Sequence, residues 1–182
     1  MRTNPEDICR IVSEMDRMAG LGFEACPCSL GGLVAGLGHP AWEVRLAAVA
    51  GLGLRCERTA VPHLLELLRW EHTQPIYGQK DSVGQDLPKE WTEEQRAAYA
   101  RRWRLKSEIC FALGNCGDAS ALDALILLCT DQKEDYNVRA AACKALGQLR
   151  DPRALPALRV AAGDWEFCTR ARARWAMRQI EG

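Results

Sequence analysis

The sequence lacks the long apolar runs that mark membrane proteins. No apolar stretch in its 182 residues approaches the roughly 18 residues that a membrane-spanning helix needs. The stretch from Met1 to Ala19 is amphipathic rather than uniformly apolar, so we expect no secretory signal. These two absences predict a cytoplasmic protein that has no membrane partner.

Net charge is also lacking, because 24 Lys and Arg residues balance 24 Asp and Glu residues. A dedicated nucleic-acid-binding domain is usually basic overall, so we do not expect nucleic acid as the main partner. The halves nevertheless differ: residues 1–95 contain 9 basic and 14 acidic side chains, and residues 96–182 contain 15 and 10. This asymmetry either steers an acidic partner to the C-terminal half or reflects a set of solvated helix faces.

Patterns that carry enzyme chemistry are missing as well. The sequence contains no Gly-x-Ser-x-Gly, no phosphate-binding loop and no dinucleotide fingerprint. Its three histidines, at 39, 63 and 72, fall in separate stretches of the chain. Cys26 and Cys28 form one close cysteine pair, but a closed zinc site needs four ligands and no second pair follows at finger-like spacing. We therefore expect no catalytic residues, no metal and no cofactor.

What the sequence does contain is an internal repeat. Residues 42–53 resemble residues 136–147 at an offset of 94, and residues 103–114 form a middle copy. The offset from the first copy to the middle one is 61, and the offset from the middle copy to the last is 33. The relation continues downstream, where residues 60–64 correspond to residues 154–158. A period in the low thirties with two apolar helical patterns per unit predicts stacked helix pairs.

The apolar spacing predicts where each helix begins and ends. Long helices are expected at 41–54, 103–116, 135–149 and 166–180, and shorter ones precede them at 30–38, 59–70, 119–130 and 151–162. A further helix at 4–19, with Asn4 as its N-cap and Pro5 in its first turn, matches no repeat position. We expect that helix to cap the end of the stack.

An insertion interrupts the repeats within residues 71–102, because the offsets of 61 and 33 differ by 28. Its first part, residues 71–90, lacks periodicity and predicts a loop of functional interest. Its second part begins with a capping box at Thr92 and Gln95, from which a helix can run unbroken into residues 103–116. The insertion residues that we expect to contact a partner are Tyr77, Trp91 and Arg102.

The repeat resembles the HEAT-like repeats of the phycobilisome-lyase type. That pattern joins a Val-Arg-x-x-Ala-x-x-Ala-Leu-Gly helix to a following Ala-x-x-x-Leu helix, and residues 138–147 fit it closely. Residues 44–53 fit with Gly51 in place of an alanine, and residues 105–114 fit more loosely because Lys106 replaces the arginine. Ankyrin and tetratricopeptide signatures are missing.

The resemblance covers residues 28–180 apart from the insertion and implies an all-α fold. We expect a right-handed α-α superhelix, a HEAT-like solenoid of about four helix pairs with an N-terminal capping helix. The 182 residues are then one domain, with a cap and connector at 1–27, repeats at 28–70 and 103–182, and the insertion at 71–102.

By the same resemblance, the Val-Arg helices line the concave side of the solenoid. Trp42, Arg45 and Val49 lie three and four positions apart and share one stripe, which recurs in the later copies. Aromatic and cationic pairs suit recognition, because such residues dominate interface hot spots. Alternatively, each aromatic packs in a turn between repeats and each cation bonds neighbouring helix ends. The candidate partner-binding residues are Trp42, Arg45, Trp103, Lys106, Tyr136, Arg139, Arg170 and Arg174.

Cysteine is used in this pattern as a small apolar residue. Cys110 and Cys143 occupy equivalent repeat positions, and Val49 is the third member of that column. Nine cysteines are an odd number and fall below the density of small disulfide scaffolds. This usage predicts buried thiols and a reducing compartment.

These observations favour a non-catalytic scaffold or adaptor that grips an unidentified protein through the concave face and the insertion. The resemblance leaves a second possibility, a bilin-lyase-like or phycobilisome-associated protein that handles a tetrapyrrole, so that any enzymatic activity would be lyase-like. A third is a HEAT-like DNA-binding or repair protein, because Arg170, Arg174 and Arg178 follow i, i+4 spacing and would form a basic ridge. HEAT-like deoxyhypusine hydroxylases hold two irons with paired His-Glu motifs, and this sequence contains no His-Glu dipeptide.

Overall fold

The computed structural model of the chain describes residues 29–73 and 91–182. Within these two ranges all regular structure is helical. The capping helix predicted at 4–19, the Cys26 and Cys28 pair and Tyr77 lie outside the described residues.

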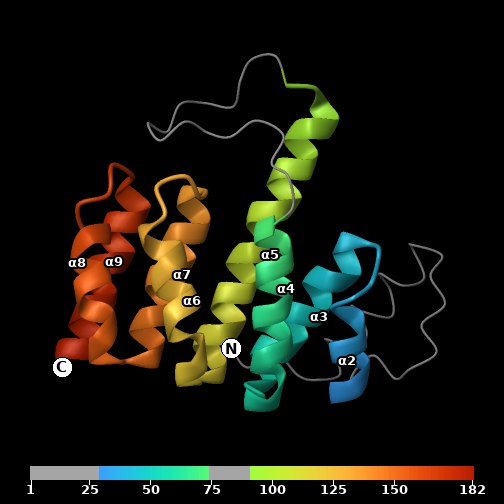
Figure 1. The fold of residues 1–182 in the computed structure, drawn as a ribbon, viewed down its shortest axis with the longest axis horizontal. Coiled ribbons are helices and arrows are strands. Elements are labelled where there is room, and N and C mark those ends of the chain that lie inside the picture. Colours follow the sequence, from blue (N-terminus) through green and yellow to red (C-terminus); the bar gives the residue numbers. More distant parts are fainter. Residues whose placement is uncertain (1–28, 74–90) are drawn as a thin grey trace.

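The helices follow one another in pairs along the chain (Figure 1). Short 3-10 turns, η1 (Arg58–Ala60), η2 (Ala119–Ala121) and η3 (Pro152–Ala154), lead into the second, third and fourth pairs. The predicted all-α solenoid is confirmed, with four helix pairs in the described residues. The pairs are α2 (Leu30–Gly36) with α3 (Trp42–Arg55), α4 (Val61–Thr73) with α5 (Glu93–Cys116), α6 (Leu122–Thr130) with α7 (Tyr136–Leu149), and α8 (Leu155–Ala161) with α9 (Phe167–Glu181).

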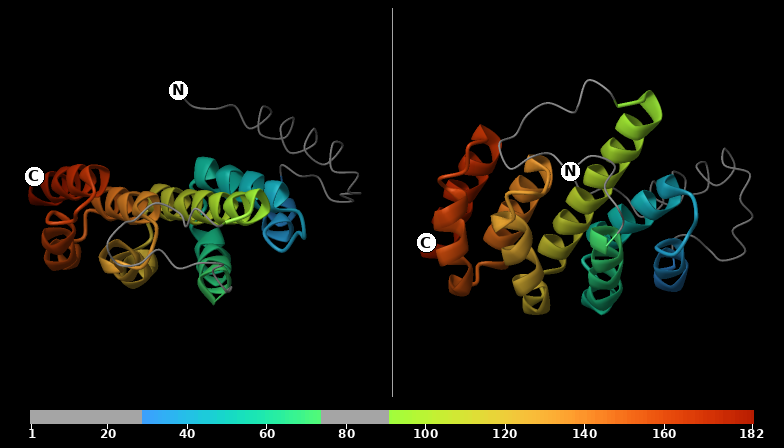
Figure 2. Two further views of the ribbon diagram at one scale, coloured as in Figure 1. Left: turned by 90° about the horizontal axis from the view of Figure 1, so that it is seen from above. Right: turned by 45° about the horizontal axis from the view of Figure 1, so that its top comes forward.

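The paired helices form two layers (Figure 2, left). Helices α3, α5, α7 and α9 pack in sequence against one another, and we call them the long-helix layer. Helices α2, α4, α6 and α8 lie against them and form the short-helix layer. The first half of α5 extends beyond its neighbours at one edge of the stack (Figure 1).

Glycines at the end of each repeat signature let the long helices touch. A Cβ atom added at Gly147 would lie 2.8 Å from the Cα atom of Ala176 in α9. Gly53 and Gly114 meet the next long helix at the same 2.8 Å separation. Any side chain at these positions would force the helices apart, which explains the Leu-Gly that closes each copy of the motif.

The capping box predicted at the start of α5 is present. Thr92 Oγ1 accepts a hydrogen bond from the Gln95 amide at 3.2 Å, and the Thr92 amide donates to Gln95 Oε1 at 3.0 Å. Helix α5 then runs unbroken to Cys116 and ends at Gly117, whose φ of +64° is left-handed. The insertion therefore lengthens a repeat helix as the sequence predicts.

The start of the predicted loop needs a correction. Residues 71–73 continue helix α4 instead of beginning a loop at residue 71. Glu71 is buried in this last turn, because its side chain turns toward the cations of the neighbouring long helices. The helix is longer than its apolar pattern suggests, because its last turn consists of the polar residues Glu71, His72 and Thr73.

The cysteine column is buried as predicted. Val49, Cys110 and Cys143 are all inaccessible to solvent and pack in the common core of the array. A hydrogen bond with Cys129 and burial raise the pKa of the Cys143 thiol well above its ordinary range. These thiols are protonated, and they pack as small apolar side chains.

Candidate functional site

Arg139, a predicted partner contact, lies at the centre of a buried ion pair. Its Nε lies 2.8 Å from Asp164 Oδ2 and its Nη2 lies 3.0 Å from Asp164 Oδ1, while its Nη1 donates to the Glu134 carbonyl at 2.6 Å. Its side chain is 1% exposed, and that of Asp164 is fully buried. Burial opposes ionisation of Asp164, but hydrogen bonds from Arg139 and the Glu166 amide hold its pKa below 3.8. Arg139 is enclosed, so its assignment to a recognition surface is corrected.

Lys106 occupies the same repeat position in α5 and is equally enclosed. Its Nζ donates to Glu134 Oε2 and lies 3.5 Å from His72 Nδ1. The charge of Lys106 is therefore compensated inside the protein, and its assignment as a partner contact is corrected as well. Both cations join one repeat to the next.

Arg45 and Arg170 bond the loops that precede their own helices. Arg45 Nη1 donates to the carbonyls of His39 at 2.8 Å and Pro40 at 3.0 Å. Arg170 Nη1 donates to the carbonyls five and six positions before it, at 2.7 and 2.8 Å. Arg45 Nη2 also lies 3.6 Å from Glu71. Arg45 and Arg170 thus bond helix ends, which is the second of the two interpretations open from the sequence, whereas Arg174 is exposed.

The acids of these pairs are functional residues that sequence reasoning missed. Glu71, Glu134 and Asp164 follow the cations that they pair with, Arg45, Lys106 and Arg139, at similar offsets along the chain. Each acid lies in the following helix pair, at or after the end of its short helix and before its long helix. An acid that recurs a little less than one repeat after a buried cation is the signal that could have found them.

The aromatic members of the stripe do not form one continuous surface. The guanidinium groups of Arg101 and Arg104 in α5 lie 5.8 and 6.0 Å from the ring centroid of Trp42, so α5 covers that ring. Tyr136 is half-buried, and its carbonyl accepts a hydrogen bond from Thr169 at 3.3 Å. Trp103 alone of the three lines an open groove.

The described insertion residues brace the fold. Trp91 is 7% exposed and packs edge-on against Tyr99, with ring centroids 5.5 Å apart. The Tyr99 hydroxyl donates to Asp135 Oδ2 at the start of α7, and burial together with this bond raises the Tyr99 pKa. Arg102 Nη2 donates to the His72 carbonyl at 3.3 Å. Trp91 is therefore a packing residue, which corrects its assignment as a partner contact.

A groove opens on the long-helix layer between α3 and α5, with a volume of about 420 Å³. Small and aliphatic residues of α3 line one side, and Trp103, Phe111 and the charged Arg104 and Glu108 of α5 line the other. Ser107 also lines the groove; it is 7% exposed, and its hydroxyl has no hydrogen-bond partner in the described structure. We call this feature the α3–α5 groove; its α3 residues are Leu46, Ala47 and Ala50.

The charges beside the groove are held close to apolar surface. Burial raises the pKa of Glu108 above its ordinary value of 4.5, although Lys144 opposes the shift. Lys144 Nζ lies 4.6 Å from the ring centroid of Phe111, a distance typical of a cation–π contact. The groove therefore combines aromatic walls with a rim of both charge signs.

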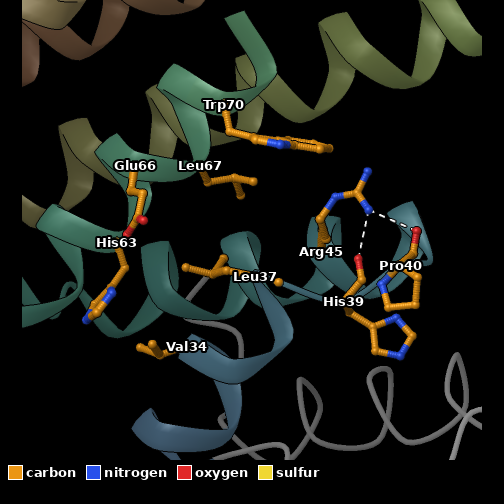
Figure 3. A pocket seen from close by; sticks show the side chains of 10 residues that line it. Val34, Leu37, His39, Pro40, Arg45, His63, Glu66, Leu67 and Trp70 are labelled. Carbon is orange, nitrogen blue, oxygen red and sulfur yellow. Dashed lines mark hydrogen bonds between the residues drawn. The ribbon is translucent and has the colours of Figure 1, made fainter. Parts of the chain in front are cut away.

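A second pocket, of about 560 Å³, lies at the other side of α3 and is lined by α2, the loop after it and α4 (Figure 3). Helix α2 has 7 residues and α4 has 13, and the pocket opens between them. Leu37 and Leu67 give it an apolar floor, and Trp70, 49% exposed, forms a wall. Arg45 lies 5.6 Å from the centroid of the Trp70 ring. Its polar rim is His39, His63 and Glu66.

Neither hollow resembles a metal centre. In residues 29–73 and 91–182, no three His, Cys, Asp or Glu side chains are placed to hold a metal ion. Over the same residues, no helix has the length and apolar character needed to cross a bilayer. Apolar walls with a few charged groups at the rim are suited to anchoring side chains of another molecule.

Comparisons with known proteins agree with the architecture. Residues 94–178, from the start of α5 to the last turn of α9, match the family described as HEAT repeats. No curated protein sequence matches the chain. The solved structure of human deoxyhypusine hydroxylase in complex with glycerol is similar at 19% identity and a TM-score of 0.41, covering 97% of this chain and 78% of that one, a likeness too low to support an inference. The helix pairs and the family match over residues 94–178 together support a HEAT-like repeat architecture.

Proposed function

We propose that this protein is a non-catalytic interaction module whose partner protein docks on the long-helix layer at the α3–α5 groove. HEAT repeats are generally protein-interaction scaffolds, which supports the class of function. The observation that carries the proposal is the groove itself, about 420 Å³ of space with aromatic walls on a face that is otherwise closely packed.

The groove has the properties of an interface anchor site. Trp103 and Phe111 are partly buried and packed against the core, so they offer apolar area at little cost in side-chain entropy. Ala47 and Ala50 are small and leave depth opposite these rings. An aliphatic or aromatic side chain of the partner fills that depth and displaces water from both walls.

Polar groups at the groove fix the orientation of the partner. Arg104 and Glu108 lie at the rim with opposite charges. A partner segment that carries the complementary order of charges gains specificity and association rate more than raw affinity.

The direct test is a substitution that fills the groove, compared with the same kind of substitution on another surface of the protein. Ala50→Arg places a long cation into the groove, whereas Leu127→Arg makes the same kind of change on α6 in the short-helix layer, at a residue already 61% exposed. Partners captured by the wild-type protein are identified, purified and titrated by calorimetry. We expect Ala50→Arg to weaken binding by at least about tenfold, since it blocks a central pocket, and Leu127→Arg to leave it unchanged. Equal affinity of the wild type and Ala50→Arg would exclude the groove.

The insertion is the second part of the proposed surface. Trp91 is a packing residue, so we place the proposed partner contact of the insertion in residues 74–90, where Tyr77 lies. The sharpest variant replaces residues 74–90 with a Gly-Ser linker of equal length, which preserves Thr73 in α4 and Trp91 beside Tyr99. We expect this variant to fold normally and to bind the partner less tightly. Unchanged affinity would remove the insertion from the surface.

We retain the phycobilisome-lyase subfamily as the finer proposal about family, with tetrapyrrole handling as the corresponding alternative function. It is supported by the fit of residues 138–147 to that repeat pattern. Mixing the protein with a linear tetrapyrrole and recording visible absorbance tests it, because binding changes the spectrum of the bilin. We also propose a cytoplasmic location, which the buried free thiols Cys110, Cys129 and Cys143 support.

A further inference from the structure

The last helix exposes the stripe that the preceding long helix uses for stacking. In α7, the stripe Tyr136, Ala140, Cys143 and Gly147 belongs to the side of the helix that meets α9. The equivalent positions in α9, at a repeat offset of 31, are Phe167, Ala171, Arg174 and Arg178. These four α9 residues are all exposed, and we call them the end stripe.

The opposite side of α9 is the one that packs on the array. Thr169, Ala173 and Ala176 are fully buried, while Phe167 is 70% exposed. Helix α9 lies at the C-terminal end of the stack (Figure 1). The end stripe therefore faces away from α7, with no further repeat beyond it in the described residues. Compared with α7, the end stripe keeps an aromatic residue and an alanine at its first two positions. Arginines replace the cysteine and the glycine at the other two.

The arginines prevent another repeat from stacking in the regular way. Gly147 allows α9 to approach so closely that an added Cβ would lie 2.7 Å from Trp175 and 2.8 Å from Ala176. Arg178 stands at the equivalent position, so a helix cannot reach the same separation on α9. A polar residue of any kind would end the array, but this stripe carries two cations beside an exposed ring.

The cations of the end stripe are uncompensated. Across residues 29–73 and 91–182, neither Arg174 nor Arg178 forms an ion pair. Helix α9 contains four arginines and a single acid, Glu181. Arginine presents a planar fork that binds carboxylates through two parallel hydrogen bonds, so the stripe is a set of ready donors for oxyanions.

We infer that the end stripe binds an acidic segment of a protein, in extended conformation, which carries an apolar residue and two carboxylates. The spacing sets the pattern. Arg174 and Arg178 lie about 6 Å apart along the helix axis, and Phe167 lies about 10 Å from Arg174. An extended chain rises about 3.3 Å per residue, so the two acids are two positions apart and the apolar residue is three positions from the nearer acid.

A protein segment fits this stripe better than nucleic acid does. The stripe offers two free arginines and one exposed ring over about 16 Å, and the net charge of the chain is zero. Nucleic-acid affinity depends on many phosphate contacts, whereas one apolar contact and two charge pairs suffice to orient a peptide. The inference rests on the proposed function in one respect, that the ligand is a protein, but it concerns a surface far along the array from the α3–α5 groove (Figure 2).

The test uses a designed peptide and the full-length chain. The probe is a fluorescein-labelled Gly-Phe-Gly-Ser-Glu-Ser-Glu-Gly octapeptide, and binding is followed by fluorescence polarisation at about 50 mM salt, where exposed charges are weakly screened. The wild type is compared with R174E/R178E and with R58E/R69E, which makes the same change of net charge at exposed arginines near the other end of the described array. All four arginines are exposed, so circular dichroism should show an intact fold.

We expect the wild type to bind the octapeptide, R174E/R178E to weaken binding by at least about tenfold and R58E/R69E to change it by less than about twofold. Phe167→Ala should weaken binding by about threefold or more, because the apolar contact is lost. Equal weakening by both charge-reversal pairs overturns the inference, since it indicates charge alone. So does tighter binding of a labelled octathymidylate, or no binding of the octapeptide. The groove variant Ala50→Arg should bind the octapeptide like the wild type, so the two proposals fail separately.

Discussion

The same cation–acid pair occurs in three repeats, and it changes in character from the C-terminal to the N-terminal half. Arg139 and Asp164 form two short hydrogen bonds with almost no access to solvent, whereas Arg45 approaches Glu71 only to 3.6 Å and is 15% exposed. The third pair, Lys106 and Glu134, lies between these two along the array, and Lys106 Nζ contacts one oxygen of Glu134. The repeats of the C-terminal half are thus joined by Arg139–Asp164, which we call the tight pair. Those of the N-terminal half are joined by Arg45–Glu71, which we call the loose pair.

Both candidate hollows lie in the half of the molecule that contains the loose ion pair. The α3–α5 groove and the second pocket flank α3, beside the loose pair and next to the repeat that the insertion interrupts. The regular repeats from α6 to α9 provide the scaffold. The partner-binding surfaces that we propose are departures from the repeat, at α2–α5 and at the exposed end of α9.

Breaking the tight pair should have the largest effect. Arg139→Ala leaves Asp164 as an uncompensated buried charge, so we expect a loss of about 3–5 kcal/mol in the free energy of unfolding. Arg45→Ala should cost less, about 1–3 kcal/mol, because the pair with Glu71 is longer, although two hydrogen bonds to backbone carbonyls are also lost. Urea denaturation followed by circular dichroism measures both. Equal losses would contradict the contrast between the two halves.

A smaller effect comes from closing the approach between long helices. Gly147→Ala introduces a Cβ that would lie 2.7–2.8 Å from Trp175 and Ala176, and we expect a loss of about 1–3 kcal/mol. Gly31→Ala in α2 is the control, because nothing lies within 4 Å of the added atom. Since alanine favours helix, that change should be neutral or stabilising by up to about 1 kcal/mol. Thermal melts compare the stability of Gly147→Ala and Gly31→Ala. Equal destabilisation would show that the tight packing is not specific to the long-helix layer.

The smallest effect should appear in the pH dependence. Burial raises the Glu71 pKa above 4.5 despite Arg45, Arg102 and Lys106, so ionised Glu71 opposes folding increasingly as pH rises through and above that value. Asp164 behaves oppositely: its lowered pKa stabilises the fold above the unfolded value, near 3.8, and this contribution is lost as pH falls. As the pH rises from about 4 to about 7, Glu71→Gln should therefore gain stability relative to wild type, and Asp164→Asn should lose it. Urea titrations at both pH values check the signs, and a common sign would contradict this account.

The sequence predicted the scaffold well, because helix periodicity and caps are local signals. The expected long helix at 135–149 is observed as Tyr136–Leu149, and the capping box at Thr92 starts α5 at the predicted position. The repeated Leu-Gly is a sequence signal too, although its physical reason is a contact between helices that are distant in sequence. Valine and cysteine occupy the same repeat position at Val49, Cys110 and Cys143, and this exchange correctly predicted that all three are buried in the core.

The candidate surface was less predictable, because one stripe of a helix does not say which neighbour it faces. Arg139 and Lys106 share the spacing of an exposed ridge, yet their acids come from beyond their own helices and enclose them. In the sequence Trp91 has the pattern of an exposed loop aromatic, but in the structure its ring packs against Tyr99. The α3–α5 groove depends on the distance between two helices, which no local pattern encodes.

Hydrogen–deuterium exchange of the protein with and without its captured partner tests the central claim most directly. In the free protein, amides of α7 and α9 should exchange more slowly than those of α2 and α4, because the tight pair and the glycine contacts join the C-terminal repeats. On binding, new protection should concentrate in the segments 42–54 and 101–111, which line the α3–α5 groove. Protection confined to α6 and α8, with none in α3 and α5, would contradict the account.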